Sequence, residues 1–148
     1  MYKKILVPLD GSKRAETILS HVEDLAQSFQ SRLLFIKVIT PEVMYRGSPD
    51  MLLDIPYAQE TLDRHVQDAE DYLSALVGEF VEKGIEADHR VEVGTVVSAI
   101  IDAAEKEKVD LIAMASHGRT GLSHVFYGSV AAGVLHRVNR PLLLVRSV

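Results

Sequence analysis

Short apolar runs alternate with amphipathic segments along the chain of 148 residues. The segments typical of strands cover residues 5–7, 33–39, 87–93, 109–114 and 142–145. Between them, apolar residues recur at helical spacing over residues 15–29, 62–80, 96–104 and 130–138. Strands that alternate with helices form a parallel sheet covered on both faces. The sequence therefore predicts one doubly wound α/β domain over residues 1–148, with a five-stranded parallel sheet.

The composition excludes several classes of function. The net charge of −5 argues against general binding of nucleic acid, which requires a basic surface. The chain has no cysteine, and this excludes disulfides, thiol catalysis and thiolate metal sites. The first apolar run is too short for a signal peptide, and no run is long enough to cross a bilayer. We expect a cytoplasmic protein that binds no membrane.

The order of the strands follows from two loops rich in glycine and polar residues. The first strand ends at PLDGS (8–12), and the fourth ends at ASHG (115–118). Ligands of doubly wound sheets bind at the carboxyl ends of the strands, where the strand order reverses. If both loops serve one site, strands 1 and 4 are neighbours and the order is 3-2-1-4-5. That order also places strand 87–93 at an edge, as its alternating polar pattern independently predicts.

The segment after the fourth strand is a candidate phosphate site. Gly118, Gly121 and Gly128 allow close approach of the backbone to an anion, and Arg119 offers a bidentate contact. The helix that starts near Ser129 would present free N–H groups. However, neither GxxxxGK[ST] nor GxGxxG is present, so a plain glycine-rich turn stays an alternative. The spacing of His117 and His124 matches no standard zinc site, and a surface or phosphate-neighbouring role fits them better.

Three further features of the sequence lead to structural expectations. The fifth strand, at a sheet edge in the predicted order, is continuously apolar at Leu142, Leu143, Leu144 and Val145. Such an edge invites association, so we expect a homodimer through this strand, although the last helix and the C-terminal residues are an alternative cover. Residues 41–56 are expected to form a long irregular loop, either a lid or a flexible insertion. Ser12 is expected to cap a helix.

The chain resembles the universal stress protein family nearly end to end, in KKILVPLDGS, VEVGTVVSAIIDAAEKEKVDLIAMASHGRTG and FYGSVAAGVLHRVNRPLLLV. The ATP-binding branch of that family carries a motif of Gly, two residues, Gly, nine residues, and Gly followed by Ser or Thr. Here Gly118 is the second glycine, and Gly128 with Ser129 completes the motif. Ala115 stands in the place of the first glycine.

The resemblance implies an ATP site, with Mg²⁺ or Mn²⁺ bridging the phosphates. Pro8, Leu9 and Asp10 would lie near adenine and ribose, with Asp10 in contact with ribose or metal. Val38 would recognise adenine through its backbone. The remaining implied or candidate contacts, on the ribose and phosphate side, are Met114, Ala115, His117, Gly118, Arg119, Gly121, Gly128, Ser129 and Val130.

The predicted function is that of a homodimeric, ATP-binding regulatory protein of the stress response. One alternative is a slow ATPase or phosphotransferase, for which Asp10 or His117 would be the base. The phosphate loop has no lysine, so binding without efficient turnover fits better. Another alternative is a dimeric interaction protein with a vestigial nucleotide site. Asp10 has a purely structural alternative as well, as a turn or helix cap.

Overall fold

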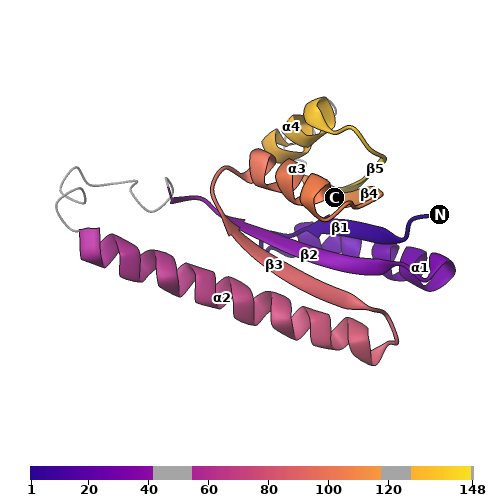
Figure 1. Cartoon of the computed structure of the whole chain (residues 1–148), viewed down its shortest axis with the longest axis horizontal. Helices are drawn as coiled ribbons and strands as arrows, with labels where there is room; N and C mark the ends of the chain where they lie inside the picture. Colours follow the sequence, from indigo (N-terminus) through magenta and orange to yellow (C-terminus); the bar gives the residue numbers. More distant parts are fainter. Residues whose placement is uncertain (42–54, 118–127, 148) are drawn as a thin grey trace.

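The computed structural model describes residues 1–41, 55–117 and 128–147. Its strands are β1 (Lys4–Pro8), β2 (Arg32–Ile39), β3 (Ala87–Val93), β4 (Leu111–His117) and β5 (Leu142–Ser147). Its helices are the short 3₁₀ helix η1 (Ala15–Ile18) and α1 (Leu19–Phe29), α2 (Ile55–Glu82), α3 (Val96–Lys106) and α4 (Ser129–Arg137). Strands and helices alternate along the chain as predicted (Figure 1).

The five strands form one sheet in the order β3-β2-β1-β4-β5. Every pair of neighbouring strands is parallel, and this confirms the predicted fold class and strand order. β1 lies at the centre, where Ile5 pairs with Leu33 of β2 on one side and with Leu111 of β4 on the other. The chain proceeds from β1 toward the β3 edge and then returns to β4, so the strand order reverses between β1 and β4.

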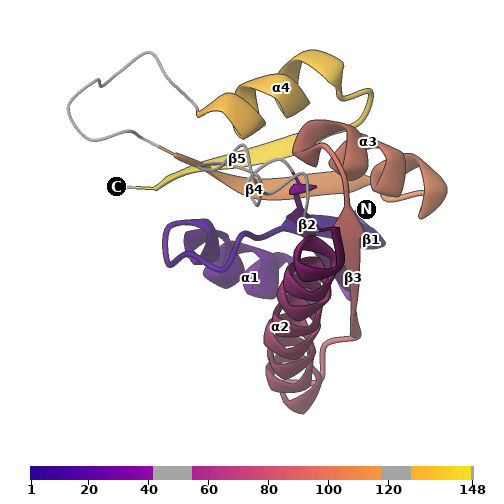
Figure 2. The ribbon, with the colours of Figure 1, turned by 90° about the vertical axis from the view of Figure 1, so that its left-hand side faces the viewer.

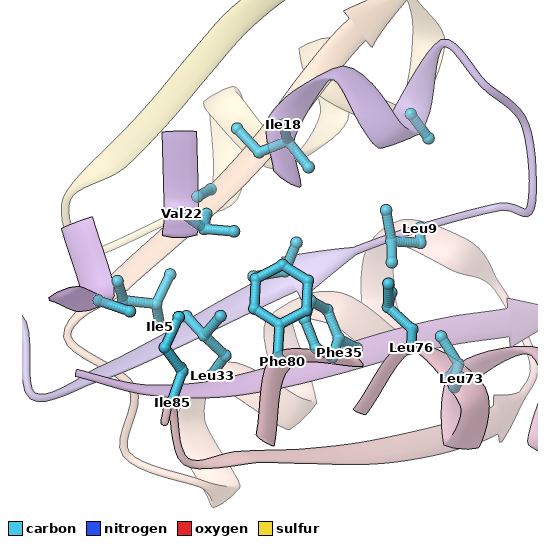
Figure 3. Packing of buried hydrophobic residues seen from close by; sticks show 14 of the residues in the cluster. Ile5, Leu9, Ile18, Val22, Leu33, Phe35, Leu73, Leu76, Phe80 and Ile85 are labelled. Atoms are coloured by element: carbon cyan, nitrogen blue, oxygen red, sulfur yellow. The ribbon is translucent and has the colours of Figure 1, made fainter. Parts of the chain in front are cut away.

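Helices cover both faces of the sheet, as predicted for a doubly wound domain. Figure 2 shows α3 and α4 on one face and α1 and α2 on the other. Each face buries its own apolar cluster. The cluster beneath α1 and α2 includes Phe35 of β2 and Phe80 of α2, whose ring centroids lie 5.2 Å apart (Figure 3). The cluster beneath α3 and α4 includes Leu6, Ile112 and Val134.

The long helix α2 packs on the sheet through its second half. Leu73, Leu76 and Phe80 are buried, whereas Leu62 and Val66 of the predicted apolar stripe are only half-buried. Figure 1 shows the reason, since the amino-terminal half of α2 extends past the end of β3. Among the described residues, no helix combines the length and apolar character needed to cross a bilayer.

Several element ends differ from the sequence expectation. The helix predicted over residues 15–29 begins with the 3₁₀ turn η1, and the Ser12 hydroxyl accepts a hydrogen bond from the Ala15 N–H at 3.1 Å. Residues 42–54 of the predicted loop 41–56 lie outside the described residues. The prediction that this loop includes Pro56 is wrong, because α2 already begins at Ile55. Proline fits the first turn of a helix, where its missing N–H has no partner to lose.

Candidate functional site

A cavity of about 280 Å³ lies at the carboxyl ends of β1, β2 and β4, where the strand order reverses. The first turns of α3 and α4 close it on one face of the sheet. Among the described residues, its lining is apolar except for Asp10 and Thr40. The lining residues are Pro8, Leu9, Asp10, Ala15, Ile36, Val38, Thr40, Val96, Ile100, Met114, Ala115, Val130 and Ala131. Small ligands of doubly wound sheets bind at this position.

The cavity brings together much of the set that the sequence singled out. Seven of the thirteen predicted contact residues line it: Pro8, Leu9, Asp10, Val38, Met114, Ala115 and Val130. Gly128 and Ser129 precede Val130 at the start of α4. His117 ends β4, but its side chain is not among those described. Gly118, Arg119 and Gly121 lie outside the described residues.

Six lining residues escaped the sequence prediction. Ile36 of β2 and Thr40, directly after β2, lie two residues before and after Val38. The two-residue period of a strand is a signal that could have found them. Ala15, Val96, Ile100 and Ala131 come from helices. They reach the cavity because of how η1, α3 and α4 pack on the sheet, and no local pattern reports that packing.

Asp10 shapes the loop that follows β1. One of its carboxylate oxygens accepts a hydrogen bond from the Ser12 N–H at 2.8 Å, and this bond forms a tight turn two residues long. Gly11, inside that turn, has φ +87°, a conformation that favours glycine. The structural alternative for Asp10, a turn cap, is therefore present. This turn leaves Asp10 on the cavity wall, so Asp10 can cap the turn and also contact a ligand in the cavity.

A polar cluster supports the same loop from the α2 side of the sheet. The Tyr72 hydroxyl of α2 donates a hydrogen bond to Glu16, just after the loop. The Lys37 ammonium lies 5.6 Å from the centroid of the Tyr72 ring. Burial, followed by the hydrogen bond to Glu16, raises the pKa of Tyr72 above its ordinary value of 10.0, and the negative charge of Asp10 adds to this effect. Tyr72 is therefore a neutral donor at physiological pH.

The amino terminus of α4 lies beside the cavity, since Val130 belongs to both. Gly128 stands at the N-cap position with φ +79°. It has no side chain with which to bind the first N–H groups of the helix, and no other described side chain caps them. The first N–H groups of a helix lack partners within the helix, and its dipole favours an anion there. This end of α4 therefore has the electrostatic character of an anion site.

Ala115 adopts ordinary strand geometry in β4, paired with Val145 of β5. In the part of the chain that the structure describes, the non-glycine residues with positive φ are Tyr2, Gln30 and Lys108, so Ala115 has no need of a glycine conformation. Among the described residues, no group of three or more acidic or histidine side chains is placed to hold a metal ion.

The fold and the cavity define a class of protein, the doubly wound α/β domains with a pocket for a small molecule at the switch point of the sheet. Within that class, the chain belongs to the universal stress protein family, whose family model matches residues 1–146.

Individual relatives agree with this assignment. Universal stress protein MJ0577 of Methanocaldococcus jannaschii is 30% identical over 155 residues, which cover 99% of this chain and 96% of that protein. The solved structure of MJ0577 superposes with a TM-score of 0.85 at 29% identity, covering 100% of this chain and 98% of the other.

Two more distant structures share the fold and were solved with adenine nucleotides. A universal stress protein in complex with cAMP has a TM-score of 0.63 at 20% identity, covering 98% of this chain and 97% of the other. The universal stress protein of Archaeoglobus fulgidus in complex with dAMP has a TM-score of 0.64 at 19% identity, covering 97% of each chain.

Proposed function

We propose that this chain is a cytoplasmic, homodimeric regulatory protein of the stress response that binds ATP in the cavity at the switch point. The observation that carries the proposal is the apolar cavity of about 280 Å³ that adjoins the uncapped amino terminus of α4. An apolar slot next to an anion site matches the two unlike parts of a nucleotide. Its purine base gains from burial, and its phosphates gain from the positive end of a helix dipole.

Cavities that bury a whole drug-sized ligand measure about 300–1,000 Å³, and the described walls enclose about 280 Å³. We therefore propose that the cavity would hold the base and ribose, with the phosphates outside it. The base would lie against Val38 and Met114, and Asp10 would accept hydrogen bonds from the ribose hydroxyls. The phosphates would extend to Gly128 and Ser129.

The phosphate side of the proposed site includes residues from the segment after β4. Gly118, Arg119 and Gly121 keep their predicted roles as phosphate contacts, with His117 as their neighbour. Four phosphate charges require cationic partners, and Arg119 supplies only one. We therefore keep Mg²⁺ or Mn²⁺ as the second source of positive charge, with Asp10 as its nearest candidate ligand.

The two distant structures solved in complex with cAMP and dAMP support an adenine nucleotide as the ligand proposed for this chain. Both contain adenine, although their phosphates differ. The base is the common feature, and the base is the part that the apolar cavity would hold. The choice of ATP rests on Gly128 and Ser129, which complete the glycine motif of the ATP-binding branch.

The proposed activity is binding rather than rapid turnover. Phosphoryl transfer requires a positioned nucleophile or base together with stabilisation of charge. Asp10 is the one titratable side chain among the described residues of the cavity wall, and it already accepts the Ser12 N–H. A slow ATPase with Asp10 or His117 as base is the second candidate, and an Asp10→Asn variant that binds but no longer hydrolyses ATP would establish it.

The two edges of the sheet differ in a way that favours a homodimer through β5. The edge strand β3 carries Asp88, Arg90 and Glu92, and charges of this kind discourage pairing with another strand. At the opposite edge, residues 142–145 of β5 are apolar and half-buried. Because an apolar edge favours strand pairing, we propose that β5 meets its symmetry mate.

Isothermal titration with ATP and Mg²⁺ tests the nucleotide site. The variants are Gly128→Glu and a matched control, Gly84→Glu. Both glycines have positive φ, at +79° and +82°, so both substitutions add backbone strain and the same charge. The strain is greater at Gly128, whose ψ of 155° lies in a region essentially confined to glycine, so circular dichroism must show that both variants are folded. Gly84 lies at the other end of the sheet, where α2 has ended. We expect saturable binding by the wild type and by Gly84→Glu, and none by Gly128→Glu. A folded wild type that binds no adenine nucleotide would refute the proposal.

A further inference from the structure

We infer that Gly133 of α4 is a positioning residue that sets the width of the cavity. A Cβ atom built on Gly133 would lie 2.7 Å from Cγ2 of Val97 and 3.3 Å from its Cγ1. Cβ atoms in proteins essentially never approach another heavy atom within 3.0 Å. The backbone of α4 therefore rests directly against a side chain of α3, at a separation that only glycine permits.

Val97 can relieve this contact by rotation only if it leaves its preferred rotamer. Valine is branched at Cβ and strongly prefers one χ1 rotamer in a helix. The Cβ of Val97 lies at an ordinary contact distance of 3.5 Å from the position of the added atom, so the clash comes from the two γ-methyl groups. A larger residue at position 133 therefore forces Val97 out of its preferred rotamer or moves α3 and α4 apart, and we infer that the helices separate, because the three contacts lie on one side of the added atom.

The contact between Gly133 and Val97 lies next to the wall of the cavity, because neighbours of both residues line it. Val96, next to Val97, lines the cavity from α3, and Val130, one helical turn before Gly133, lines it from α4. Figure 2 shows the two helices side by side on the same face of the sheet. A second contact, a hydrogen bond of 3.0 Å from Arg137 to the Ser98 hydroxyl, joins the same two helices. Separation of the helices at Gly133 would therefore widen the cavity between Val96 and Val130.

The identity of the ligand rests on the proposed function, but the steric argument does not. A planar base is held by contact with both walls of a narrow slot, so a wider slot binds it less tightly. Glycine is among the least favourable residues for a helix interior. Gly133 is thus explained by the close approach that it allows.

Gly78 of α2 provides a matched control. It also lies inside a helix, but a Cβ atom at this position would meet nothing within 4 Å. Gly78→Ala should therefore improve helix propensity without moving any neighbour. The comparison of Gly133→Ala with Gly78→Ala separates the steric effect from the general effect of adding a methyl group to a helix.

The experiment measures ATP affinity by titration for Gly133→Ala, Val97→Ala, the double variant and Gly78→Ala. We expect Gly133→Ala to weaken binding by about tenfold, while its fold is retained by circular dichroism. Removing the two γ-methyl groups of Val97 makes room for the new methyl, so the double variant should bind within about threefold of Val97→Ala. Gly78→Ala should bind like the wild type.

A second measurement does not depend on the ligand. The methyl group of Met114, on the cavity wall, can be followed by ¹³C-methyl NMR of the protein without nucleotide. Gly133→Ala should shift this resonance, the double variant should largely restore it, and Gly78→Ala should leave it unchanged. If the wild type binds no ATP but the resonance follows this pattern, the proposed function fails and the role of Gly133 stands. If Gly133→Ala changes neither the resonance nor the affinity of a wild type that binds ATP, the inference about Gly133 is wrong.

Discussion

Arg90 of the edge strand β3 and Glu107, directly after α3, form an ion pair with 2.7 Å between Nη1 and Oε1. The other carboxylate oxygen of Glu107 accepts a hydrogen bond from the ammonium of Lys4 on β1, also at 2.7 Å. Glu107 therefore links the edge strand to the central strand across β2. The hydrogen bond from Lys4 and the charges of Lys4 and Arg90 lower the pKa of Glu107 below its ordinary value of 4.5, although partial burial acts in the opposite direction.

The first prediction concerns Glu107→Gln. Because the pKa of Glu107 is lowered by folding, its carboxylate stabilises the folded state above the unfolded-state pKa, and this contribution is lost as the pH falls through the folded-state pKa. We expect the variant to lower the free energy of unfolding at pH 7 by about 1 kcal/mol. Urea denaturation should show this difference shrinking below about pH 4.

Glu86→Gln is the control for Glu107→Gln. Glu86 pairs with Arg32 at 2.8 Å, but both side chains are more than half exposed. Exposed pairs contribute little because water and salt screen them. The control should therefore match the wild type closely. An effect of Glu107→Gln that is as large at pH 3 as at pH 7 would contradict the assigned role.

A second prediction concerns Tyr72→Phe and alkaline pH. Folding raises the pKa of Tyr72 above its ordinary value of 10.0, mainly through burial and then through the bond to Glu16. The unfolded chain therefore releases this proton first, and the free energy of unfolding falls as the pH rises above 10. The difference in free energy between wild type and Tyr72→Phe, from urea denaturation, should narrow over this range. Curves that stay parallel would show that Tyr72 does not titrate as described.

A third prediction concerns Ala115, which replaces the first glycine of the family motif. Because Ala115 has ordinary strand geometry, glycine there relieves no strain. We expect Ala115→Gly to lower the free energy of unfolding by about 0.5–1 kcal/mol, since glycine has more freedom to lose in a strand. Its ATP affinity, from titration calorimetry, should stay within about threefold of the wild type. A gain well beyond that would mean that the Ala115 methyl obstructs the nucleotide.

A fourth prediction tests the proposed dimer. Leu144→Glu places a charge on the apolar edge strand β5. In sedimentation equilibrium we expect the wild type to be a dimer and this variant to be a monomer. Val81→Glu is the control, because Val81 is 54% exposed on α2, away from β5. Circular dichroism must show that both variants are folded. A wild type that sediments as a monomer at every concentration would exclude the dimer.

The sheet order was predictable because two independent signals converge on it. The polar loops after β1 and β4 require these strands to be neighbours, and the alternating pattern of residues 87–93 requires an edge. Each signal is read from a short segment of the sequence, but together they specify the order of all five strands. The ends of β4 and β5 were less predictable. Ser116 pairs with Arg146 in this register, and the Ser147 hydroxyl bonds to the Ser116 carbonyl at 2.7 Å. β4 and β5 continue into polar residues because the backbone of each strand provides hydrogen-bond partners for the backbone of the other.

The site residues that were predicted and line the cavity lie on strands or directly after them, except Val130 of α4. Most of the lining residues that were missed lie on helices. Val38 lies near the carboxyl end of β2 and Met114 in the second half of the strand predicted over residues 109–114, and the family resemblance identifies both. Ile100 and the pair formed by Gly133 and Val97 depend on how two helices approach each other. The sequence of either helix alone reports its own apolar face but not the distance to its neighbour.

The central position of β1 has a consequence for biosynthesis. β1 is made before the other four strands of the sheet, yet one of its two neighbours is β4. The Lys3 N–H donates a hydrogen bond to the carboxylate of Asp110, a residue 107 positions later. At a translation rate of about 5–20 residues per second, β1 waits on the order of 5–20 seconds for this partner. During that time the nascent chain exposes one long side of β1 to the ribosome exit site and to chaperones. The sheet therefore closes late, as the last third of the chain emerges.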